Sequence, residues 1–467
     1  MFSISRFCLL WQICSATVTL PHSAKHQAAA AHAIVRDVAI IGGGATGTYA
    51  AIRLQEDFNK SVVVIEKERA LGGHTHTYHD PISKTNVELG VVAFHDLPVV
   101  TKFFARFDIP LVKFFFNYTL KNVDFRNGHP VGELESVKST LGMFADYSEQ
   151  LQRFKSLEEG YVFPAPVPED LVRPFEHFAR IHNLTALIPR IWTIDQGVGD
   201  LLQLPTLYVL KSFGPQMLRS LSSGFWTTKR RNNHELYERA FQRLKTSNSV
   251  HVNSVVEFMN RDIPGRYGKM VVSTPFGNKV VHAKQFLFTI PPTLETLTGF
   301  DLDTYEKNLF SAFQYMEYST GLIRGAPIAR GTTMCNKIPN PHVYFLPRLP
   351  TVYTLGPTHQ PSFLTDVKFG SNTSSMTEQQ IREHILSDSS RALPGNPDLE
   401  LVAYASHKPY QLRVSSDLIR DGFYQEMNGL QGLRRSYWTG AAWHAHDSGL
   451  LWNFTEGILL RMQQDWS

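Results

Sequence analysis

The chain contains little cysteine and no long hydrophobic run. Two of its three cysteines, Cys8 and Cys14, lie near the N-terminus, and the third is Cys335. If the N-terminal segment is removed as a leader, only Cys335 remains, so no disulfide can form within the chain. The apolar stretch over residues 7–20 is interrupted by polar residues and is too short to cross a bilayer. We therefore expect no transmembrane span, and a fold that depends on its hydrophobic core.

The sequence also lacks a strong excess of charge. Its formal net charge is +4, and the one tight basic cluster, Lys229-Arg230-Arg231, is followed by polar residues. A solvated loop explains that cluster better than a nucleic-acid site does. We predict no nucleic-acid partner and no metal site.

The first 24 residues have the pattern of a secretory signal peptide, with Arg6 before an apolar stretch. This predicts that the protein enters the secretory pathway or is secreted. Glycosylation sequons, which fit that route, occur at Asn59, Asn117, Asn183, Asn372 and Asn453. Asn372 is the favoured acceptor, whereas Asn453 is expected to be buried beside the cofactor.

A glycine-rich turn after the first apolar strand is the most informative feature that is present. Gly42 allows a sharp turn, Gly44 leaves room for a pyrophosphate, and Gly47 lets the next helix pack closely. Ala45 and Thr46 begin that helix, whose N–H groups and dipole favour an anion. The turn predicts a dinucleotide site; the alternative is an ordinary strand–turn–helix unit.

The residues after this turn favour FAD over NAD. Glu66 ends the second apolar strand and is expected to accept hydrogen bonds from two ribose hydroxyls. A second glycine pair, Gly72-Gly73, would let the backbone lie against an extended cofactor. Here the sequence resembles the FAD-dependent amine oxidoreductase superfamily, which includes monoamine oxidase. In that family an arginine follows the glycine pair, whereas this chain has His74, so a permanent positive charge is missing.

The resemblance implies an α/β fold with a discontinuous Rossmann-like flavin domain and an interleaved α+β substrate domain of amine-oxidase type. The flavin domain is expected over 35–100, 245–300 and 400–465. The substrate domain is expected over 101–244 and 301–399. Within the flavin segments, the strand that contains Val255 resembles a later strand of the superfamily, in which the chain returns to the adenine side of the cofactor.

The C-terminal segment resembles the terminal flavin motif of the superfamily. Gly440 and Ala441 end a strand, and Ser448-Gly449 opens a helix. The resemblance implies that this helix points at the flavin ring, where the amides of Leu450 and Leu451 would stabilise negative charge on the reduced cofactor.

Two departures from that motif bear on the substrate. Monoamine oxidases usually have a glutamate and an aromatic residue where this chain has Ala442 and Leu450. Tyr410 supplies one aromatic wall, but a cage for an amine needs two facing rings, so simple amine oxidation is disfavoured. Tyr410 and His444 are the candidate catalytic residues. A structural role for His444 is equally compatible, and His446 is a similar candidate acid or base.

The flavin is expected to be non-covalent, because no cysteine lies upstream of Gly440 where monoamine oxidases attach it. Cys335 or a histidine such as His74 would be the alternative attachment point.

In their residues as well as their spacing, these motifs resemble fungal beta-cyclopiazonate dehydrogenase-like flavoproteins and polyenoic fatty acid isomerases more closely than they resemble monoamine oxidases. That resemblance implies hydride removal from a carbon of an apolar or polycyclic substrate, by dehydrogenation or oxidative cyclisation in fungal secondary metabolism. Oxygen or another acceptor would then reoxidise the flavin. The alternatives are a double-bond isomerase of polyunsaturated fatty acids, an amine oxidase, and a non-catalytic dinucleotide-binding protein.

Two other stretches allow structural predictions. Phe103, Phe104 and Phe107 have helical spacing, which favours an ordinary core over a substrate pocket. The proline-rich stretch 338–361 is typical of edge strands and loops.

Overall fold

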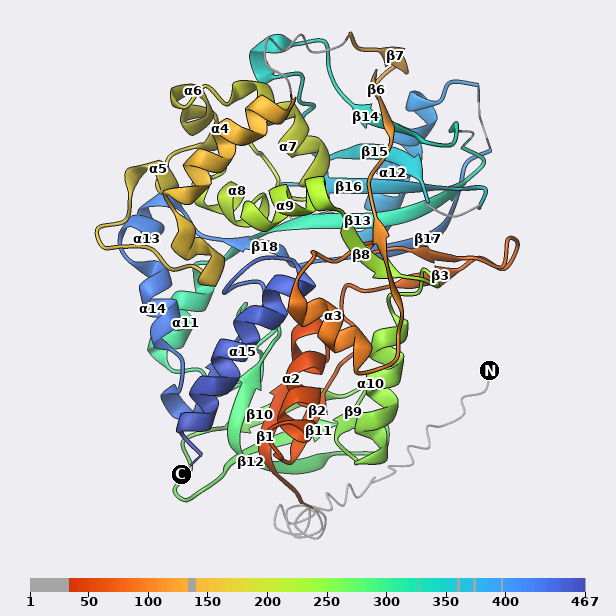
Figure 1. The fold of residues 1–467 in the computed structure, drawn as a ribbon. Coiled ribbons are helices and arrows are strands. Elements are labelled where there is room, and N and C mark those ends of the chain that lie inside the picture. The colour runs from red at the N-terminus through yellow and green to blue at the C-terminus, as the bar shows by residue number, and fades with distance from the viewer. Residues whose placement is uncertain are drawn as a thin grey trace, which may run out of the picture.

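The computed structural model describes residues 33–132, 140–326, 328–358, 362–372, 375–395 and 398–466. Two large sheets dominate the fold, one in the lower and one in the upper half of Figure 1, and a group of helices lies beside the upper sheet. The predicted signal peptide, residues 1–24, lies outside the described residues.

The first sheet has seven strands and contains the predicted dinucleotide unit. Its central strand β1 pairs in parallel with β12 on one side and β2 on the other. Both neighbours bury their side chains at the centre of the sheet, as a parallel sheet covered on both faces requires. In spatial order the strands are β10 (Val255–Asn260), β11 (Gly268–Ser273), β12 (Lys279–Phe288), β1 (Ile34–Ile41), β2 (Val62–Ile65) and β9 (Val250–His251), with β19 (Ser436–Trp438) pairing with β12.

Helices from distant parts of the chain cover this sheet and share one core. Trp452 is fully buried there, and its ring stacks on Tyr49 with 5.6 Å between centroids. Phe103 and Phe104 pack on the same indole, so the prediction that the Phe103 stretch is ordinary core is confirmed. These helices are α2 (Ala45–Glu56), α3 (Pro98–Ala105), α10 (Glu235–Thr246) and α15 (Ser448–Gln464).

The second sheet has eight strands and is mostly antiparallel. The helix α12 (Glu378–Ala392) packs on it, and the apolar side chains between them form a separate core. In spatial order the strands are β17 (Glu400–Ser406), β13 (Gln314–Arg324), β16 (Leu364–Ser371), β15 (Thr351–Pro357), β14 (Thr332–Asn336), β6 (Thr119–Asp124) and β7 (His129–Pro130), with β18 (Tyr410–Arg413) pairing with β13.

Short helices and two small sheets complete the described fold. The small sheets pair β3 (Thr77–His79) with β4 (Asn86–Glu88) and β5 (Leu111–Phe114) with β8 (Phe225–Thr228). The remaining helices are α4 (Thr140–Gln152), η1 (Lys155–Glu159), α5 (Glu169–Val172), α6 (Phe175–Ile181), η2 (Thr185–Leu187), α7 (Ile188–Ile194), α8 (Thr206–Ser212), α9 (Pro215–Ser223), α11 (Thr304–Ser311), η3 (Pro341–Val343), α13 (Ser416–Arg420), α14 (Phe423–Gly429) and η4 (Leu433–Arg435).

The pairing of strands departs from the predicted domain division at one boundary. β17 and β18 open the segment 400–465, which was assigned to the flavin domain, but both pair with β13 of the second sheet. The first strand of that segment that pairs with the first sheet is β19. The rest of the division stays a prediction.

Two smaller expectations are wrong. β15 is an interior strand between β14 and β16, although it comes from the proline-rich stretch, because Pro350 precedes it and Pro357 is its last residue. Asn453 is exposed on α15 rather than buried, because it lies on the helix face opposite the buried Trp452 and Thr455.

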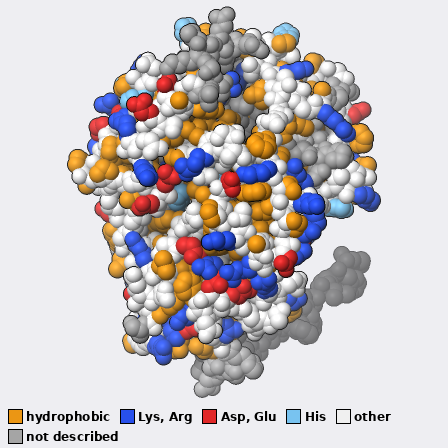
Figure 2. All heavy atoms as spheres, in the orientation of Figure 1, with side chains coloured by type: hydrophobic (Ala, Val, Ile, Leu, Met, Phe, Trp, Pro, Cys, Tyr) orange, Lys and Arg blue, Asp and Glu red, His pale blue; other side chains and the backbone are white. Residues whose placement is uncertain are grey.

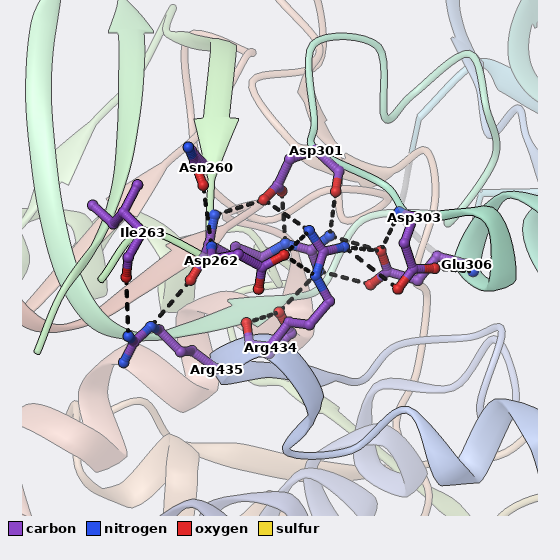
Figure 3. Close-up of polar contacts among 10 residues, drawn as sticks. Asn260, Asp262, Ile263, Asp301, Asp303, Glu306, Arg434 and Arg435 are labelled. Carbon is purple, nitrogen blue, oxygen red and sulfur yellow. Dashed lines mark hydrogen bonds and ion pairs between the residues drawn. The ribbon is translucent and has the colours of Figure 1, made fainter. Parts of the chain in front are cut away.

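An arginine–carboxylate cluster connects the end of β10 to the start of β19 and to α11 (Figure 3). Arg261, which is fully buried, donates two hydrogen bonds of 2.7 Å to the Glu306 carboxylate and one of 2.7 Å to Asp301. Arg434 donates to the same two carboxylates and to Asp262. Arg261 also donates to Ser436, the first residue of β19, at 3.0 Å. The cluster therefore fixes the strand that leads to Gly440.

The surface shows no segregation of charge on the face drawn in Figure 2, where basic and acidic side chains lie among one another. None of the described helices is both long and apolar enough to cross a bilayer.

Candidate active site

The turn between β1 and α2 has the geometry that its glycines predict. Gly42 has a φ of +102°, and a side chain at Gly47 would place its Cβ 1.9 Å from the Gly42 carbonyl oxygen. Only glycine at these positions permits the sharp exit from β1 and the close start of α2. The strand, turn and helix of the predicted dinucleotide unit are therefore present.

A second backbone segment lies directly against this turn. A Cβ at Gly73 would be 3.1 Å from the Gly44 Cα, and the Gly72 N–H donates to the Gly43 carbonyl at 2.9 Å. Gly44 and Gly73 thus form a cradle of bare backbone, which we call the glycine cradle. Such a cradle suits a pyrophosphate, since the first N–H groups of α2 are beside it.

Glu66 directly follows β2, the second strand of the βαβ unit. It is buried, and its carboxylate accepts the Gly43 N–H at 2.6 Å and the Glu68 N–H at 2.8 Å. Burial raises the pKa of this carboxyl, and the two backbone N–H donors oppose the rise. The Ser254 N–H donates to the Glu66 carbonyl at 2.9 Å, which brings Val255, the next residue, beside the position expected for the ribose and adenine.

The end of β19 and the start of α15 meet this same edge of the sheet. Gly440 has a φ of +111°, and a Cβ there would be 3.4 Å from the Thr289 carbonyl oxygen, with Ala441 following. The Trp452 indole donates to the carbonyl of Ala45, next to the buried Thr46, at 3.0 Å. The last helix therefore begins beside the glycine turn, as the sequence predicts.

The expected role of two amides in α15 needs correction. The Leu450 N–H donates to the Asp447 carboxylate at 2.8 Å, and the Leu451 N–H donates to the Asp447 carbonyl at 2.9 Å. Both donors are already engaged, because Asp447 caps the helix. An aspartate directly before the helix is the sequence signal that would have revealed this cap.

Buried polar atoms near the cradle fit a polar cofactor. Thr75 Oγ1 and His407 Nδ1 are buried and have no hydrogen-bond partner among the described residues. Thr75 lies two positions after Gly73, and the His407 ring lies 4.9 Å from the ring of His74. Unpaired buried acceptors and donors are costly, so these atoms fit a ligand rich in polar groups, such as FAD.

Five rings lie together, and we call them the tyrosine–imidazole cluster: those of His74, His407, His446, Tyr318 and Tyr410. Tyr410 stacks on His446 at 4.1 Å between centroids and contacts Tyr318 at 4.9 Å. His74 lies 6.1 Å from His446 with nearly parallel rings, and His407 contacts both His74 and Tyr318. Because the two tyrosines touch each other, they do not form a cage with an amine-sized gap between them.

The hydrogen bonds of the cluster fix the tautomers of two histidines. Thr320 donates its hydroxyl to the Leu89 carbonyl, so it accepts the N–H from His407 Nε2 at 3.1 Å, which leaves His407 Nδ1 as a bare acceptor. His446 Nε2 accepts the Gln411 N–H at 2.9 Å, so its Nδ1 carries the proton.

All three imidazoles are neutral at neutral pH. Burial lowers the pKa of His74 to about 4 and that of His446 to about 3, and it lowers the pKa of His407 well below the usual range. The rings of the cluster are therefore uncharged, and His407 Nδ1 is an imidazole acceptor without a hydrogen-bond partner among the described residues.

His444 lies apart from Tyr410. Its Nδ1 is 3.3 Å from the Lys211 ammonium nitrogen, and its Nε2 is 3.1 Å from the Glu158 carbonyl oxygen. Burial, and then the charge of Lys211, lowers its pKa well below the usual range. With both ring nitrogens bonded, His444 connects the segment between β19 and α15 to α8 and η1. His446 is the histidine of this motif that lies with Tyr410.

Two members of the cluster escaped the sequence reasoning. His407 lies three positions before Tyr410 and belongs to no sequence motif that would mark it. Tyr318 has no local signal, because it reaches the site through the pairing of β13 with β18.

Comparison with known proteins agrees with this geometry. A family model described as "NAD(P)-binding Rossmann-like domain" matches residues 40–107. The FAD-dependent oxidoreductase oblC of Cochliobolus heterostrophus is 36% identical over 443 residues, which cover 91% of each chain. Beta-cyclopiazonate dehydrogenase of Aspergillus oryzae is 31% identical over 440 residues, covering 92% of this chain and 93% of that one.

Solved structures share the fold. A CLA-producing fatty acid isomerase from P. acnes superposes with a TM-score of 0.72 at 19% identity, covering 91% of this chain and 98% of that one. A putrescine oxidase bound to putrescine gives 0.64 at 14% identity, covering 93% and 99%.

The fold and the glycine cradle define a flavoprotein with the architecture of the amine oxidases. The chain belongs to the family of fungal FAD-dependent oxidoreductases that includes beta-cyclopiazonate dehydrogenase. It is an enzyme that uses FAD, as the sequence predicts.

Proposed function

We propose that the enzyme removes hydride from a carbon of an apolar or polycyclic small molecule, by dehydrogenation or oxidative cyclisation in secondary metabolism. The observation that carries this proposal is the neutral tyrosine–imidazole cluster beside the glycine cradle. Its rings offer flat, uncharged surfaces, which suit an apolar substrate. The kinship with beta-cyclopiazonate dehydrogenase supports the same chemistry.

In this proposal the chain itself binds, orients and excludes water. Bound FAD supplies the hydride acceptor, held by the glycine cradle, Glu66, Val255 and the Gly440–Ala441 turn. Tyr410 and Tyr318 hold the substrate, and the surrounding imidazole rings limit the access of water to the reacting carbon. The neutral His74 leaves the site without the permanent cation that an arginine would provide.

The positions of Ala442 and Leu450 argue against an amine substrate. Ala442 is buried and Leu450 is half-buried, and neither side chain can bind an ammonium group. The contact between Tyr410 and Tyr318 also removes the gap that an amine would occupy.

Anaerobic flavin bleaching tests this proposal. Purified protein, with its visible flavin spectrum recorded, is mixed without oxygen with indole-derived polycycles, polyunsaturated fatty acids or primary amines. We expect polycycles to bleach the flavin and oxygen to restore its colour with measurable oxygen uptake. Bleaching by amines alone would overturn the proposal, and conversion of a fatty acid without oxygen uptake would identify an isomerase.

We also propose that the protein enters the secretory pathway and carries N-linked glycans. The N-terminal sequence supports this route, and the sequon residues Asn59, Asn117, Asn183 and Asn372 are all exposed. Expression of the full chain in a fungal host should give a secreted protein whose mobility changes after endoglycosidase treatment. An unglycosylated protein retained inside the cell would refute this route.

A further inference from the structure

A buried cation that the proposed chemistry does not use lies between α8 and the segment that leads to α15. Lys211 is 5% exposed, and its ammonium group donates to the backbone carbonyls of Leu157 at 2.6 Å and Gly160 at 3.2 Å. Its third neighbour is His444 Nδ1, at 3.3 Å. Because His444 Nε2 donates to the Glu158 carbonyl, Nδ1 is an acceptor, and three acceptors match the three N–H groups of an ammonium ion.

The positive charge of Lys211 has no carboxylate partner among the described residues. Glu158 is the acidic residue whose charge acts on Lys211, but it forms its ion pair with Arg219, at 3.0 Å. Burial lowers the pKa of Lys211 well below its usual range, and the charge of Glu158 opposes this fall only in part. Neutral carbonyls and an imidazole do not replace a counter-ion, so a buried charge in this position is costly. The fold therefore holds a cation where an anion would be favourable.

A cavity of about 30 Å³ lies at Lys211. Leu450, the third residue of α15, forms part of its wall together with His444. Most of the other side chains in the wall are apolar, among them Leu151, Phe154, Leu210 and Met217. A cavity of this size has room for about two water molecules, or for the oxygen atoms of one acidic group. The site thus combines one buried cation with an apolar wall.

The cavity and the tyrosine–imidazole cluster share the segment between β19 and α15. His444 lines the cavity, while His446, two positions later, stacks on Tyr410 of the cluster with 4.1 Å between centroids. This segment leads from the Gly440 turn to the helix that begins beside the glycine turn. A group that is bound at Lys211 therefore lies next to the part of the chain where the flavin is expected.

We propose that Lys211 binds an oxygen anion of the substrate, a carboxylate or an enolate, and so selects apolar molecules that carry one acidic group. This inference rests on the proposed function and narrows its substrate class. The 3.3 Å contact between Lys211 and the neutral His444 imidazole is the longest of the three, so an oxygen anion replaces it with a shorter, charge-assisted bond. The apolar wall covers the adjoining carbon atoms, and the single cation fixes the orientation of the ligand.

Anaerobic calorimetric titration of the FAD-containing protein tests this anion site without turnover. The probes are two matched pairs: indolebutyrate with its methyl ester, and dimedone, an enolic acid, with its enol methyl ether. We expect the wild type to bind at least one anion about 10–100-fold more tightly than its neutral partner, the value of one hydrogen bond to a charged group. The pair that shows this preference identifies the anion as a carboxylate or an enolate. Equal affinity within both pairs would overturn the proposal.

Lys211→Met and Lys211→Gln should abolish the preference for the anion, with Lys155→Met as the matched control. Lys155 is exposed on η1, the helix that contributes Leu157 to the cavity wall, so its variant should keep the preference of the wild type. The neutral probes should bind all these proteins equally. A Lys211 variant that retains FAD and the full preference would contradict the proposed site. The titration of the wild type remains decisive even if neither Lys211 variant folds.

Anaerobic flavin bleaching separates this inference from the proposed function. With an acidic substrate, Lys211→Met should need about 10–100-fold more substrate to reach half of its maximal bleaching rate. The rate at saturation should not change, because the ion pair stabilises the bound substrate and the transition state alike. A lower rate at saturation with an unchanged half-saturating concentration would contradict a binding role. A wild type that no carbon substrate bleaches would refute the proposed function, whereas the titration would still decide whether Lys211 binds an anion.

Discussion

The arginine–carboxylate cluster and the tyrosine–imidazole cluster are two groups of polar side chains that are built in opposite ways. In the arginine–carboxylate cluster every charged group faces groups of opposite charge, and the Arg261 side chain donates five hydrogen bonds to its neighbours. In the tyrosine–imidazole cluster the histidines are neutral, and His407 Nδ1 has no partner among the described residues. The first group is complete without a ligand, and the second is not. The difference separates a structural device from a binding site.

Breaking the complete cluster should produce the largest change in stability. Arg261→Met leaves Glu306, which is almost fully buried, with one cation fewer, so we expect the free energy of unfolding to fall by about 3–5 kcal/mol. Urea unfolding measures this change, and Arg266→Met, at an exposed position, should alter the value by less than about 0.5 kcal/mol. A loss below about 1 kcal/mol in Arg261→Met would show that the cluster is not essential to the fold.

A fall in pH should reduce the stability that the tyrosine–imidazole cluster contributes, but not the stability that the arginine–carboxylate cluster contributes. His74 and His446 have folded-state pKa values of about 4 and about 3, below the unfolded value, so the unfolded chain binds more protons as the pH falls through about 6.5. Stability is therefore lost on acidification, by about 1–2 kcal/mol for each histidine between about pH 7 and pH 5. The arginine–carboxylate cluster should not respond in this window, because Arg434 lowers the pKa of Asp262.

The measurement for this prediction is urea unfolding at both pH values. The double variant His74→Gln, His446→Gln should lose the part of the dependence that these two histidines carry, while His407 and His444, whose pKa values are also lowered, keep theirs. His79→Gln, at an exposed position, should keep the full dependence. Equal dependence in the double variant and the wild type would mean that other groups carry the acid sensitivity.

The smallest of the expected effects comes from substituting His444, which belongs to neither cluster. The two ring nitrogens of His444 lie within hydrogen-bond distance of Lys211 and of the Glu158 carbonyl. We expect His444→Gln to lower the free energy of unfolding by about 1 kcal/mol, which is the net value of one typical hydrogen bond. The rate of flavin bleaching and its pH dependence should stay unchanged. A bleaching rate reduced by roughly 100-fold, with FAD retained, would instead restore a catalytic role to His444.

The sequence was sufficient to predict the strand–turn–helix unit on which the cofactor site is expected, and the residues assigned to the cofactor stay a prediction. Gly42, Gly44, Gly47 and Glu66 act through local geometry, since a strand, a tight turn and a helix place them within one βαβ unit. Their spacing in the sequence therefore determines how they are arranged in the folded chain.

The substrate side could not be predicted in the same way. Tyr318 and His446 meet Tyr410 only because β13, β18 and the segment before α15 come together in the folded chain. His444 and His446 are two positions apart and have the same chemistry, so only the turn that follows Gly440 decides which one reaches Tyr410.

Flavin content of Gly44→Glu tests the placement of the cofactor most directly. A Cβ at Gly44 would be 3.8 Å from Gly73, so the fold accepts a side chain there, but the carboxylate would occupy the glycine cradle and repel a pyrophosphate. Gly132→Glu is the control, because a Cβ there meets no atom within 4 Å. We predict a folded, colourless Gly44→Glu protein with a wild-type circular dichroism spectrum, and yellow wild-type and Gly132→Glu proteins. A Gly44→Glu protein that purifies fully yellow would contradict the placement of FAD between the glycine cradle and the start of α15.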